Sequence, residues 1–232
     1  MNKAIKWLDN FWYHYKWHVI VIAFAVVFLV VAVGQMVNKE KVDVYVMYAG
    51  PTAFLPGEIY DIQDDFEDFM PDINGDGKKI VQFIDITLLT DGQVKEYMDE
   101  AEKAGTEYKP DMEYISNARQ KFKLQLAAGD AYLLLLDPEL YKEDYGIGMY
   151  EKLLDLGIET EYAYDDSAIK FKETDFGKYY SSFEKFPEDT LMCFRKLNVT
   201  GKARGKKEQK KYDDQLVFMK QILDFETSSD EE

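Results

Sequence analysis

The feature that most constrains this chain is an uncharged apolar run from Val19 to Val37, in which only Gln35 is polar. As an α-helix, the run would be about 28 Å long, close to the ~30 Å hydrocarbon thickness of a bilayer. Aromatic residues crowd the sequence just before it, as is typical of a membrane–water interface. We therefore predict a transmembrane helix over residues 19–37, preceded by an aromatic, basic juxtamembrane segment over residues 1–18.

Basic residues beside the run indicate its orientation. The N-terminal flank carries Lys3, Lys6 and Lys16 against Asp9, whereas the two lysines just after the run are offset by two acidic residues. Lysine and arginine near a span favour the cytoplasmic side. We expect a single-pass protein of the cell membrane, with a cytoplasmic N-terminus and an extracytoplasmic domain over residues 39–225.

A cleaved signal peptide is the alternative interpretation. Ala32-Val33-Gly34 places small residues before a cleavage point at Gln35. The apolar core of a signal peptide usually has 7–15 residues, and this run is longer. The uncleaved anchor is the prediction that we carry forward, and in both cases the folded part lies outside the cytoplasm.

The charge and histidine content of the outer part exclude several functions. The whole chain has a net charge of −16 and its first 38 residues contribute +2, so the rest carries −18, which argues against nucleic-acid partners. Both histidines, His14 and His18, precede the apolar run. The outer domain therefore lacks a Ser-His-Asp or Cys-His site. Cys193 is the only cysteine, so no internal disulfide forms.

Hydrophobic periodicity predicts an alternating order of strands and helices in the first part of the outer domain. The expected elements are a strand at Val42–Tyr48, a helix between Gly57 and Pro71, a strand at Lys79–Ile86, helices at Asp91–Lys103 and Met112–Ala128, and a buried strand at Ala131–Leu136. This β-α-β-α-β order indicates an α/β domain with a mostly parallel sheet in three α/β/α layers.

Signals are weaker beyond Pro138. Short helices are expected at Pro138–Lys142 and Met149–Leu156, strands at Ala168–Lys172 and Thr190–Leu197, and a final helix at Glu208–Phe225. Residues 226–232 are acidic and small, which predicts a disordered tail.

The stretch from Val42 to Leu140 resembles the first lobe of the extracellular solute-binding proteins of the type 2 periplasmic-binding class. The resemblance rests on the opening strand Val44–Gly50, on Phe66-Glu67-Asp68-Phe69, and on Leu124 to Asp130 before a buried strand. It implies a binding role without catalysis. Full members carry a second lobe of comparable size, for which residues 141–225 are too few. Shortened, membrane-tethered chains of this kind are similar to proteins of anaerobic Gram-positive bacteria.

A calcium loop is the sharpest local motif. In Asp72-Ile73-Asn74-Gly75-Asp76-Gly77-Lys78, side-chain oxygens stand at positions 1, 3 and 5 and glycine at position 6, and Lys78 offers a carbonyl at position 7, as in the first half of an EF-hand or dockerin loop. Ile80 and Phe83 occupy positions 9 and 12, where the second half needs oxygen ligands. The alternative is a turn rich in Asx and glycine. Ca²⁺ is the only cofactor that the sequence suggests.

Ligands of parallel α/β sheets bind outside the carboxyl ends of the strands. The candidate ligand-binding residues there are Tyr48, Gly50, Asp85, Thr87 and Asp137. The alternative interpretation is that these residues only end their strands.

Two further groups of charged residues have plainer explanations. Lys202 to Lys211 forms a basic island that fits an exposed loop running into a helix, or a contact with a partner. The acidic pairs Asp64-Asp65, Asp165-Asp166 and Asp213-Asp214 could serve a glycosidase, but solvated surface is the simpler interpretation.

The leading functional hypothesis is a non-enzymatic, membrane-tethered binding module that presents a recognition surface to a small solute or to a neighbouring membrane or wall protein. The alternative is a structural or adaptor protein that acts only through protein contacts. A carboxylate-dependent hydrolase of the cell wall is a third hypothesis.

Overall fold

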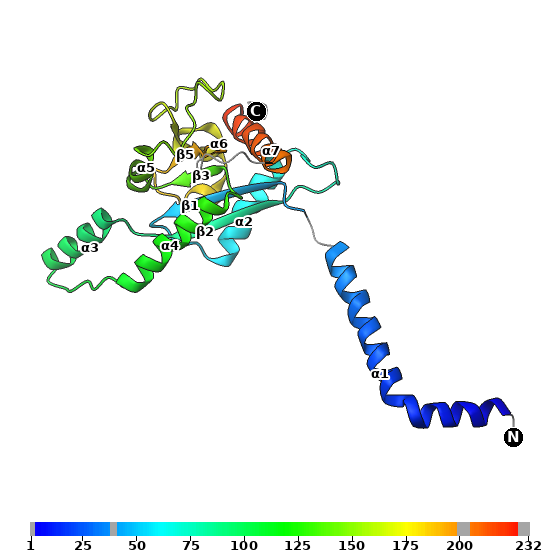
Figure 1. Ribbon diagram of the computed structural model, residues 1–232. Helices are drawn as coiled ribbons and strands as arrows, with labels where there is room; N and C mark the ends of the chain where they lie inside the picture. Colours follow the sequence, from blue (N-terminus) through cyan, green and yellow to red (C-terminus); the bar gives the residue numbers. More distant parts are fainter. Residues whose placement is uncertain (1–2, 38–40, 199–204, 227–232) are drawn as a thin grey trace, which may run out of the picture. The chain divides into compact units, whose positions relative to one another are not determined.

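The computed structural model describes residues 3–37, 41–198 and 205–226 and consists of two compact units, Met1–Lys41 and Val42–Glu232. The first unit contains helix α1, Lys3–Val37 (Figure 1). Within α1, Phe11–Gly34 is long and apolar enough to cross a membrane, so a helix able to span is found as predicted, although it begins and ends earlier than the predicted residues 19–37. That finding is compatible with a membrane anchor or a signal anchor.

The second unit is built on one five-stranded sheet in the order β2-β1-β3-β5-β4. Its strands are β1 (Val44–Gly50), β2 (Val81–Thr87), β3 (Leu133–Leu136), β4 (Ala168–Lys170) and β5 (Leu191–Phe194). β1 pairs in parallel with β2 and β3, while β5 runs antiparallel to both β3 and β4. The sheet is therefore mostly parallel, as predicted, with one reversed strand that the sequence pattern did not reveal.

Alternation along β1 divides the core between the two faces of the sheet. Val44, Val46 and Tyr48 belong to one apolar cluster, and Met47 and Ala49 belong to the other. The sequence of β3 is Leu-Leu-Leu-Leu and all four residues are buried, which is typical of a strand covered on both faces.

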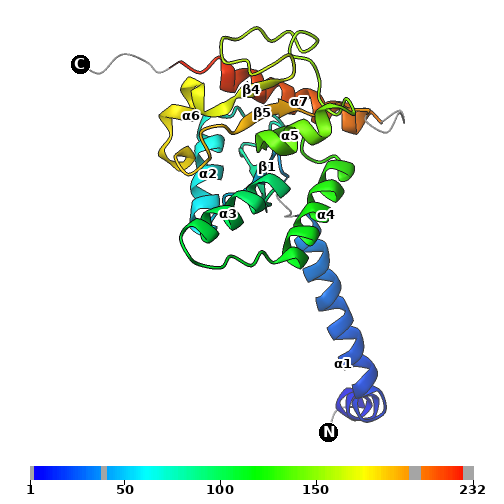
Figure 2. The ribbon, with the colours of Figure 1, turned by 90° about the vertical axis from the view of Figure 1, so that its left-hand side faces the viewer.

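Helices α2 (Pro56–Phe69), α6 (Asp175–Tyr179) and α7 (Lys206–Leu223) supply the first cluster (Figure 2). Ile62 and Phe66 of α2 are spaced four residues apart and are fully buried. Phe66 lies 5.7 Å from Phe176 of α6 and 5.7 Å from Phe218 of α7, measured between ring centroids. Aromatic contacts thus join the three helices on this face.

Helices α4 (Met112–Ala128) and α5 (Pro138–Tyr145) cover the opposite face. The Asp111 side chain accepts a hydrogen bond from the Tyr114 N–H at 2.9 Å and caps the start of α4. The buried residues of α4 recur at helical spacing: Ile115, Ala118, Phe122 and Leu126. Helices on both faces of a mostly parallel sheet give the predicted three layers.

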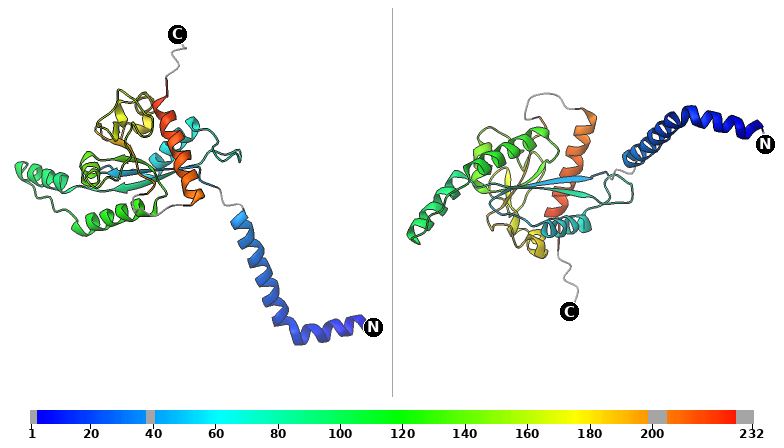
Figure 3. Two further views of the ribbon diagram at one scale, coloured as in Figure 1. Left: turned by 45° about the horizontal axis from the view of Figure 1, so that its top comes forward. Right: turned by 90° about the horizontal axis from the view of Figure 1, so that it is seen from below.

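Helix α3 (Asp91–Lys103) departs from this arrangement. Its bounds match the prediction, but none of its residues is buried. It extends away from the sheet together with the N-terminal end of α4 (Figures 1 and 3).

The expected helix at Met149–Leu156 is wrong. Tyr150 instead forms an isolated antiparallel bridge with Arg195, and the Glu151 N–H donates to the Phe194 carbonyl at 2.8 Å, so this segment pairs with the end of β5. β4 also ends earlier than expected, and a 3₁₀ turn, η1 (Phe171–Glu173), follows it. α6 and a second 3₁₀ turn, η2 (Ser181–Phe183), were not predicted.

Candidate functional site

The parallel strands bring the five predicted ligand-binding residues to one edge of the sheet. Gly50 of β1 is in register with Thr87 of β2, and the Asp137 N–H, just after β3, donates to the Ala49 carbonyl at 2.9 Å. The carboxyl ends of β2, β1 and β3 are therefore neighbours.

Tyr48 points into the core from this edge. Its side chain is 1% exposed, and its ring lies edge-on to Phe54 and Phe186 at 5.2 and 5.1 Å. The hydroxyl accepts a hydrogen bond from the Thr52 N–H at 3.1 Å, and burial raises the Tyr48 pKa to about 12. A Cβ on Gly50 would lie 2.5 Å from that hydroxyl oxygen, so glycine leaves the space that the tyrosine fills.

Asp137 uses its carboxylate within the fold. One oxygen accepts the Glu139 N–H at 2.8 Å and caps α5, and the other accepts the Gln93 Nε2–H at 2.7 Å. The side chain is 6% exposed, and this burial raises its pKa. Asp137 therefore ties the start of α3 to the start of α5.

Asp85 and Thr87 lie on β2, which is the outermost strand on one side of the sheet. Lys121 of α4 donates to the Asp85 carbonyl at 3.1 Å, and the Tyr114 hydroxyl donates to the Thr87 carbonyl at 3.4 Å. Within the described part of the chain, Oδ1 of Asp85 is buried without a hydrogen-bond partner, and burial raises the Asp85 pKa. A shallow hollow of about 220 Å³ lies beside Thr87 and Tyr114.

The Asp72–Lys78 loop is closed by its own side chains. The two carboxylate oxygens of Asp72 accept the N–H groups of Gly75 and Gly77 at 2.7 and 2.8 Å, and these bonds lower the Asp72 pKa. Gly77 adopts φ 84°, a left-handed conformation that suits glycine at position 6. Asp76 accepts the Lys78 N–H at 3.1 Å.

Asp43 adds a carboxylate to this loop that the motif did not include. Its oxygens accept the Asn74 and Ile80 N–H groups at 3.2 and 3.0 Å, and burial raises its pKa with help from the charges of Asp76 and Asp72. The residues fit Ca²⁺ only in part. The first half of the loop offers oxygen ligands, but position 12, where a carboxylate is needed, is Phe83, which is buried in the core with 3% of its surface exposed. In the described ranges, no three acidic, histidine or cysteine side chains are already grouped as a metal site.

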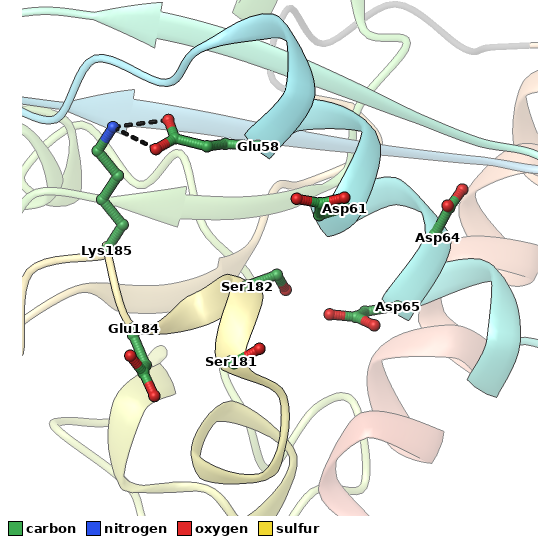
Figure 4. A pocket seen from close by; sticks show the side chains of 8 residues that line it. All are labelled: Glu58, Asp61, Asp64, Asp65, Ser181, Ser182, Glu184 and Lys185. Carbon is green, nitrogen blue, oxygen red and sulfur yellow. Dashed lines mark hydrogen bonds and ion pairs between the residues drawn. The ribbon is translucent and has the colours of Figure 1, made fainter.

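An acidic groove of about 510 Å³ lies between the exposed side of α2 and η2 (Figure 4). It is lined by Glu58, Asp61, Asp64, Asp65, Ser181, Ser182, Glu184 and Lys185. Glu58 holds Lys185 at 2.6 Å, and that lysine lowers the Glu58 pKa. The other four carboxylates face no lining lysine, so the groove suits a cationic ligand. Asp64 and Asp65, which the sequence suggested were surface residues, thus border a hollow.

The remaining acidic pairs are engaged locally. Asp165 accepts the Tyr141 hydroxyl at 2.8 Å, and Asp166 lies 2.8 Å from Lys152, which lowers the Asp166 pKa to about 2. On α7, Lys210 lies 2.6 Å from Asp214. The basic island enters the first turns of α7, where Lys211 contacts Asp130 at 2.8 Å. Residues 202–204 of the island and residues 227–232 of the tail predicted over 226–232 lie outside the described residues.

A second surface, missed by the sequence reasoning, is what we call the α3 arm, residues 91–111. At helical spacing, Val94, Tyr97, Met98 and Ala101 share one face of α3. Tyr97 and Met98 are 40% and 48% exposed. The positions beside this stripe are acidic on both sides, with Glu100 along one edge and Asp91 and Glu102 along the other.

The base of the α3 arm is fixed, because Val94 is partly buried and packs against the core cluster of α4 and α5. Further along the stripe, Tyr97 contacts only the ring of Tyr108 in the same arm, at 5.8 Å among the described rings, and Met98 is exposed. Thr90 and Gln93 form a reciprocal cap, with the Gln93 N–H donating to the Thr90 hydroxyl at 3.2 Å. Asp91 pairs with Arg119 of α4 at 3.1 Å, and Gln93 bonds to Asp137. These contacts are confined to the first turn, so the rest of α3 extends from a rigid support.

Together, the fold and these surfaces define a mixed α/β domain that follows a helix able to span a membrane. Comparisons with protein-family models, with curated proteins and with solved structures gave no match. The surfaces described above therefore carry the functional argument.

Proposed function

We propose that this protein is a non-enzymatic, membrane-tethered module that recognises a protein partner through the α3 arm, with α1 as a single-pass anchor and the domain on the extracytoplasmic side. The apolar stripe of α3 is the observation that carries the proposal. No side chain of this 13-residue helix is fully buried, and Val94 is the stripe residue that packs against the core, so α3 gains little from its own domain, whereas tertiary packing normally stabilises such helices. A partner that covers the stripe supplies that packing.

The charges around the stripe specify the chemistry of the partner. Glu100 and Glu102 border the apolar face on opposite edges, while Asp91 at its base pairs with Arg119, so a complementary surface has an apolar ridge flanked by lysine or arginine. Self-association through two α3 arms is disfavoured because it would bring acidic borders together. A neighbouring membrane or wall protein with a basic amphipathic helix fits this description.

Photo-crosslinking in the membranes of the source cell tests the proposal. We place a benzophenone side chain at Met98 in the full chain and, as a control, at Tyr60, which is 65% exposed on α2. The expected result is one crosslinked protein from position 98 and none from position 60, with the linked peptide carrying an apolar stripe between basic residues. Glu100→Lys with Glu102→Lys should abolish the crosslink, whereas Glu159→Lys with Glu161→Lys should not. A crosslink that survives reversal at Glu100 and Glu102 contradicts the proposed partner chemistry.

A small solute is the second candidate, and the acidic groove favours it. The solute-binding form of the proposal, which follows from the likeness to one lobe of a type 2 solute-binding protein, placed the ligand at Tyr48, Gly50, Asp85, Thr87 and Asp137. The groove is the more open of the two places, because Tyr48 and Asp137 are buried. Its charge selects a cation such as a polyamine.

Calorimetric titration of the domain with spermidine tests this candidate. Asp61→Asn with Asp64→Asn should weaken binding at least about tenfold, since each charge-assisted contact is worth roughly 1 kcal/mol or more. The matched control, Asp99→Asn with Glu113→Gln, removes the same net charge from the α3–α4 region and should leave the affinity unchanged. Equal losses in both variants would mean only non-specific attraction to an acidic protein.

A further inference from the structure

Helix α1 is longer than a membrane crossing requires. Its 35 residues extend about 52 Å, whereas the hydrocarbon core of a bilayer is about 30 Å thick. The apolar run ends at Val37, so the excess length lies at the N-terminal end. When the uncharged run Val19–Val37 is the part of α1 that crosses, residues 3–16 need an environment other than the hydrocarbon core, and Phe11–Lys16 of the apolar stretch then belong to the interface.

The sequence of residues 3–16 divides into two faces at helical spacing. One face holds the positions of Ile5, Trp7, Leu8, Phe11, Trp12 and Tyr15. The other holds the positions of Lys3, Lys6, Asp9, Asn10, Tyr13 and His14. Three lysines, with Lys16 at the border, against one aspartate give residues 3–16 a net charge of +2. An amphipathic helix with aromatic residues on one side and lysines on the other is typical of a helix that lies in a membrane interface.

The rings of the apolar face form a continuous row. The centroids of Trp7 and Phe11 are 5.5 Å apart, and those of Phe11 and Tyr15 are 5.2 Å apart. Trp7 is 66% exposed, and Tyr15 is 51% exposed, so this row is open to an outside surface. Aromatic side chains with a polar edge favour the headgroup level of a bilayer.

A bend separates the portion of α1 that can cross the membrane from its shorter N-terminal portion. Figures 1 and 3 show α1 as two straight portions that meet at an angle toward its N-terminal end. When the longer portion crosses the bilayer, the bend turns the shorter one toward the membrane plane. The row of rings can then enter the boundary layer while the lysines reach headgroup phosphates.

We infer that residues 3–16 form an in-plane helix that binds the surface of a bilayer containing anionic headgroups. The lipid surface is selected over a protein partner for two reasons: the segment is continuous with the spanning helix, and its lysines complement anionic lipid. The inference rests on the anchoring part of the proposed function. It adds a lipid-recognition surface that is separate from the α3 arm.

The chain carries its own probes for this inference, because its three tryptophans are Trp7, Trp12 and Trp17. We reconstitute the full chain in vesicles of phosphatidylcholine with phosphatidylglycerol and keep one tryptophan at a time, for example Trp7 with Trp12→Phe and Trp17→Phe. Quenching by lipids brominated near the headgroup and by aqueous iodide reports the depth of each tryptophan. We expect Trp7 and Trp17 at similar shallow depths, both shielded from iodide.

Charge reversal tests the role of the lysines. Each removed lysine should weaken attachment of the segment about fivefold, so Lys3→Glu with Lys6→Glu should expose Trp7 to iodide and leave Trp17 shielded. Lys39→Glu with Lys41→Glu, beyond the apolar run, is the matched control and should change neither. Vesicles of phosphatidylcholine alone should also expose Trp7.

The outcomes separate this inference from the anchor itself. Trp7 exposed to iodide beside a shielded Trp17, in the unmodified sequence and anionic vesicles, overturns the in-plane helix and keeps the anchor. Trp17 exposed as well overturns the anchor. Trp7 shielded equally with and without phosphatidylglycerol overturns recognition of anionic headgroups, and shielding only when a membrane protein is present indicates a protein partner instead.

Discussion

α3 and α4 are consecutive amphipathic helices that differ in how much of their apolar side the domain buries. α4 buries Ile115, Ala118, Phe122 and Leu126 against the sheet, whereas α3 buries none of its 13 residues. An amphipathic pattern therefore predicts a helix without saying what will cover its apolar side. The difference teaches that Tyr97 and Met98, the exposed part of the α3 stripe beyond Val94, are available to another molecule, whereas the stripe of α4 belongs to the core.

Their polar contacts differ in the same way. Lys121 and Tyr114 of α4 donate to carbonyls on the outer edge of β2, and α2 provides acceptors for the same edge, since Val81 donates to Glu67 at 2.8 Å and Phe83 to Gln63 at 3.4 Å. Side chains that occupy an edge strand protect it from pairing with other chains. Among the described residues, the side-chain polar contacts between α3 and other elements lie in its first turn, at Asp91 and Gln93, so its remaining length protects no strand.

The largest expected effect comes from a core position of α4. Phe122 is 3% exposed, so Phe122→Ala should lower the free energy of unfolding of the domain by about 3–5 kcal/mol. Met98→Ala on α3 should change it by less than about 0.5 kcal/mol, because Met98 is already 48% exposed. Chemical denaturation of residues 41–232 measures both. Similar losses for the two variants would show that α3 packs against the domain in solution.

The two N-terminal caps test whether α3 and α4 unfold separately. Thr90→Ala removes the cap of α3 and Asp111→Ala removes that of α4, each worth about 1 kcal/mol. We expect Thr90→Ala to speed amide hydrogen exchange in α3 alone, because few contacts couple α3 to the sheet. Asp111→Ala should instead lower the stability of the whole domain. Exchange that rises throughout the domain in both variants would contradict an independent α3 arm.

The elements that the sequence predicted well depend on local pattern. The spacing of Ile62 and Phe66 lies within the helix that it predicts, and the apolar run of β3 is the strand itself. The helix predicted at residues 149–156 was wrong because the structure of this segment depends on Arg195, which is 45 residues from Tyr150. The reversed direction of β5 depends in the same way on a distant partner, β3.

The candidate sites follow the same rule. Parallel topology correctly brought Gly50, Thr87 and Asp137 to one edge, but it could not show that Tyr48 faces the core or that Gln93 bonds to Asp137 across 44 residues. The acidic residues of α2 are visible in the sequence, but the second wall of the groove is formed by a distant segment that includes Lys185, which is 127 residues from its partner Glu58. Asp43 joined the calcium loop from 31 residues away.

A smaller effect on the free energy of unfolding is expected at Asp85 of β2, whose carbonyl accepts the hydrogen bond from Lys121 of α4. Burial raises its pKa in the folded state, so the folded chain holds this proton more tightly than the unfolded chain. The stability of the domain therefore falls as pH rises from the unfolded pKa of Asp85, about 4, to its higher folded pKa. Above the folded pKa, the full free-energy cost of ionising the buried carboxylate is present.

Asp85→Asn removes this titration. We expect the variant to be more stable than the parent at pH 7, by less than about 1 kcal/mol, with the difference shrinking toward pH 3. Thermal melts across this pH range measure it, and Asp99→Asn on the exposed side of α3 is the control for the loss of one carboxylate from the surface. A constant difference at every pH would assign the effect to the amide and not to the charge.

The smallest expected effect concerns calcium, which we propose as a weak ligand of the Asp72–Lys78 loop with help from Asp43. The backbone amides already occupy Asp72 and Asp43, and position 12 offers no carboxylate, so affinity in the millimolar range is expected. At a calcium concentration equal to its dissociation constant, binding stabilises the domain by only about 0.4 kcal/mol. A small rise in melting temperature should appear with calcium, disappear in Asp76→Ala and persist in Asp99→Ala. Because the loop joins α2 to β2 and not to α3, hydrogen exchange in the α3 arm should be unaffected by calcium. No shift at millimolar calcium would leave the loop as a turn closed by its own carboxylates.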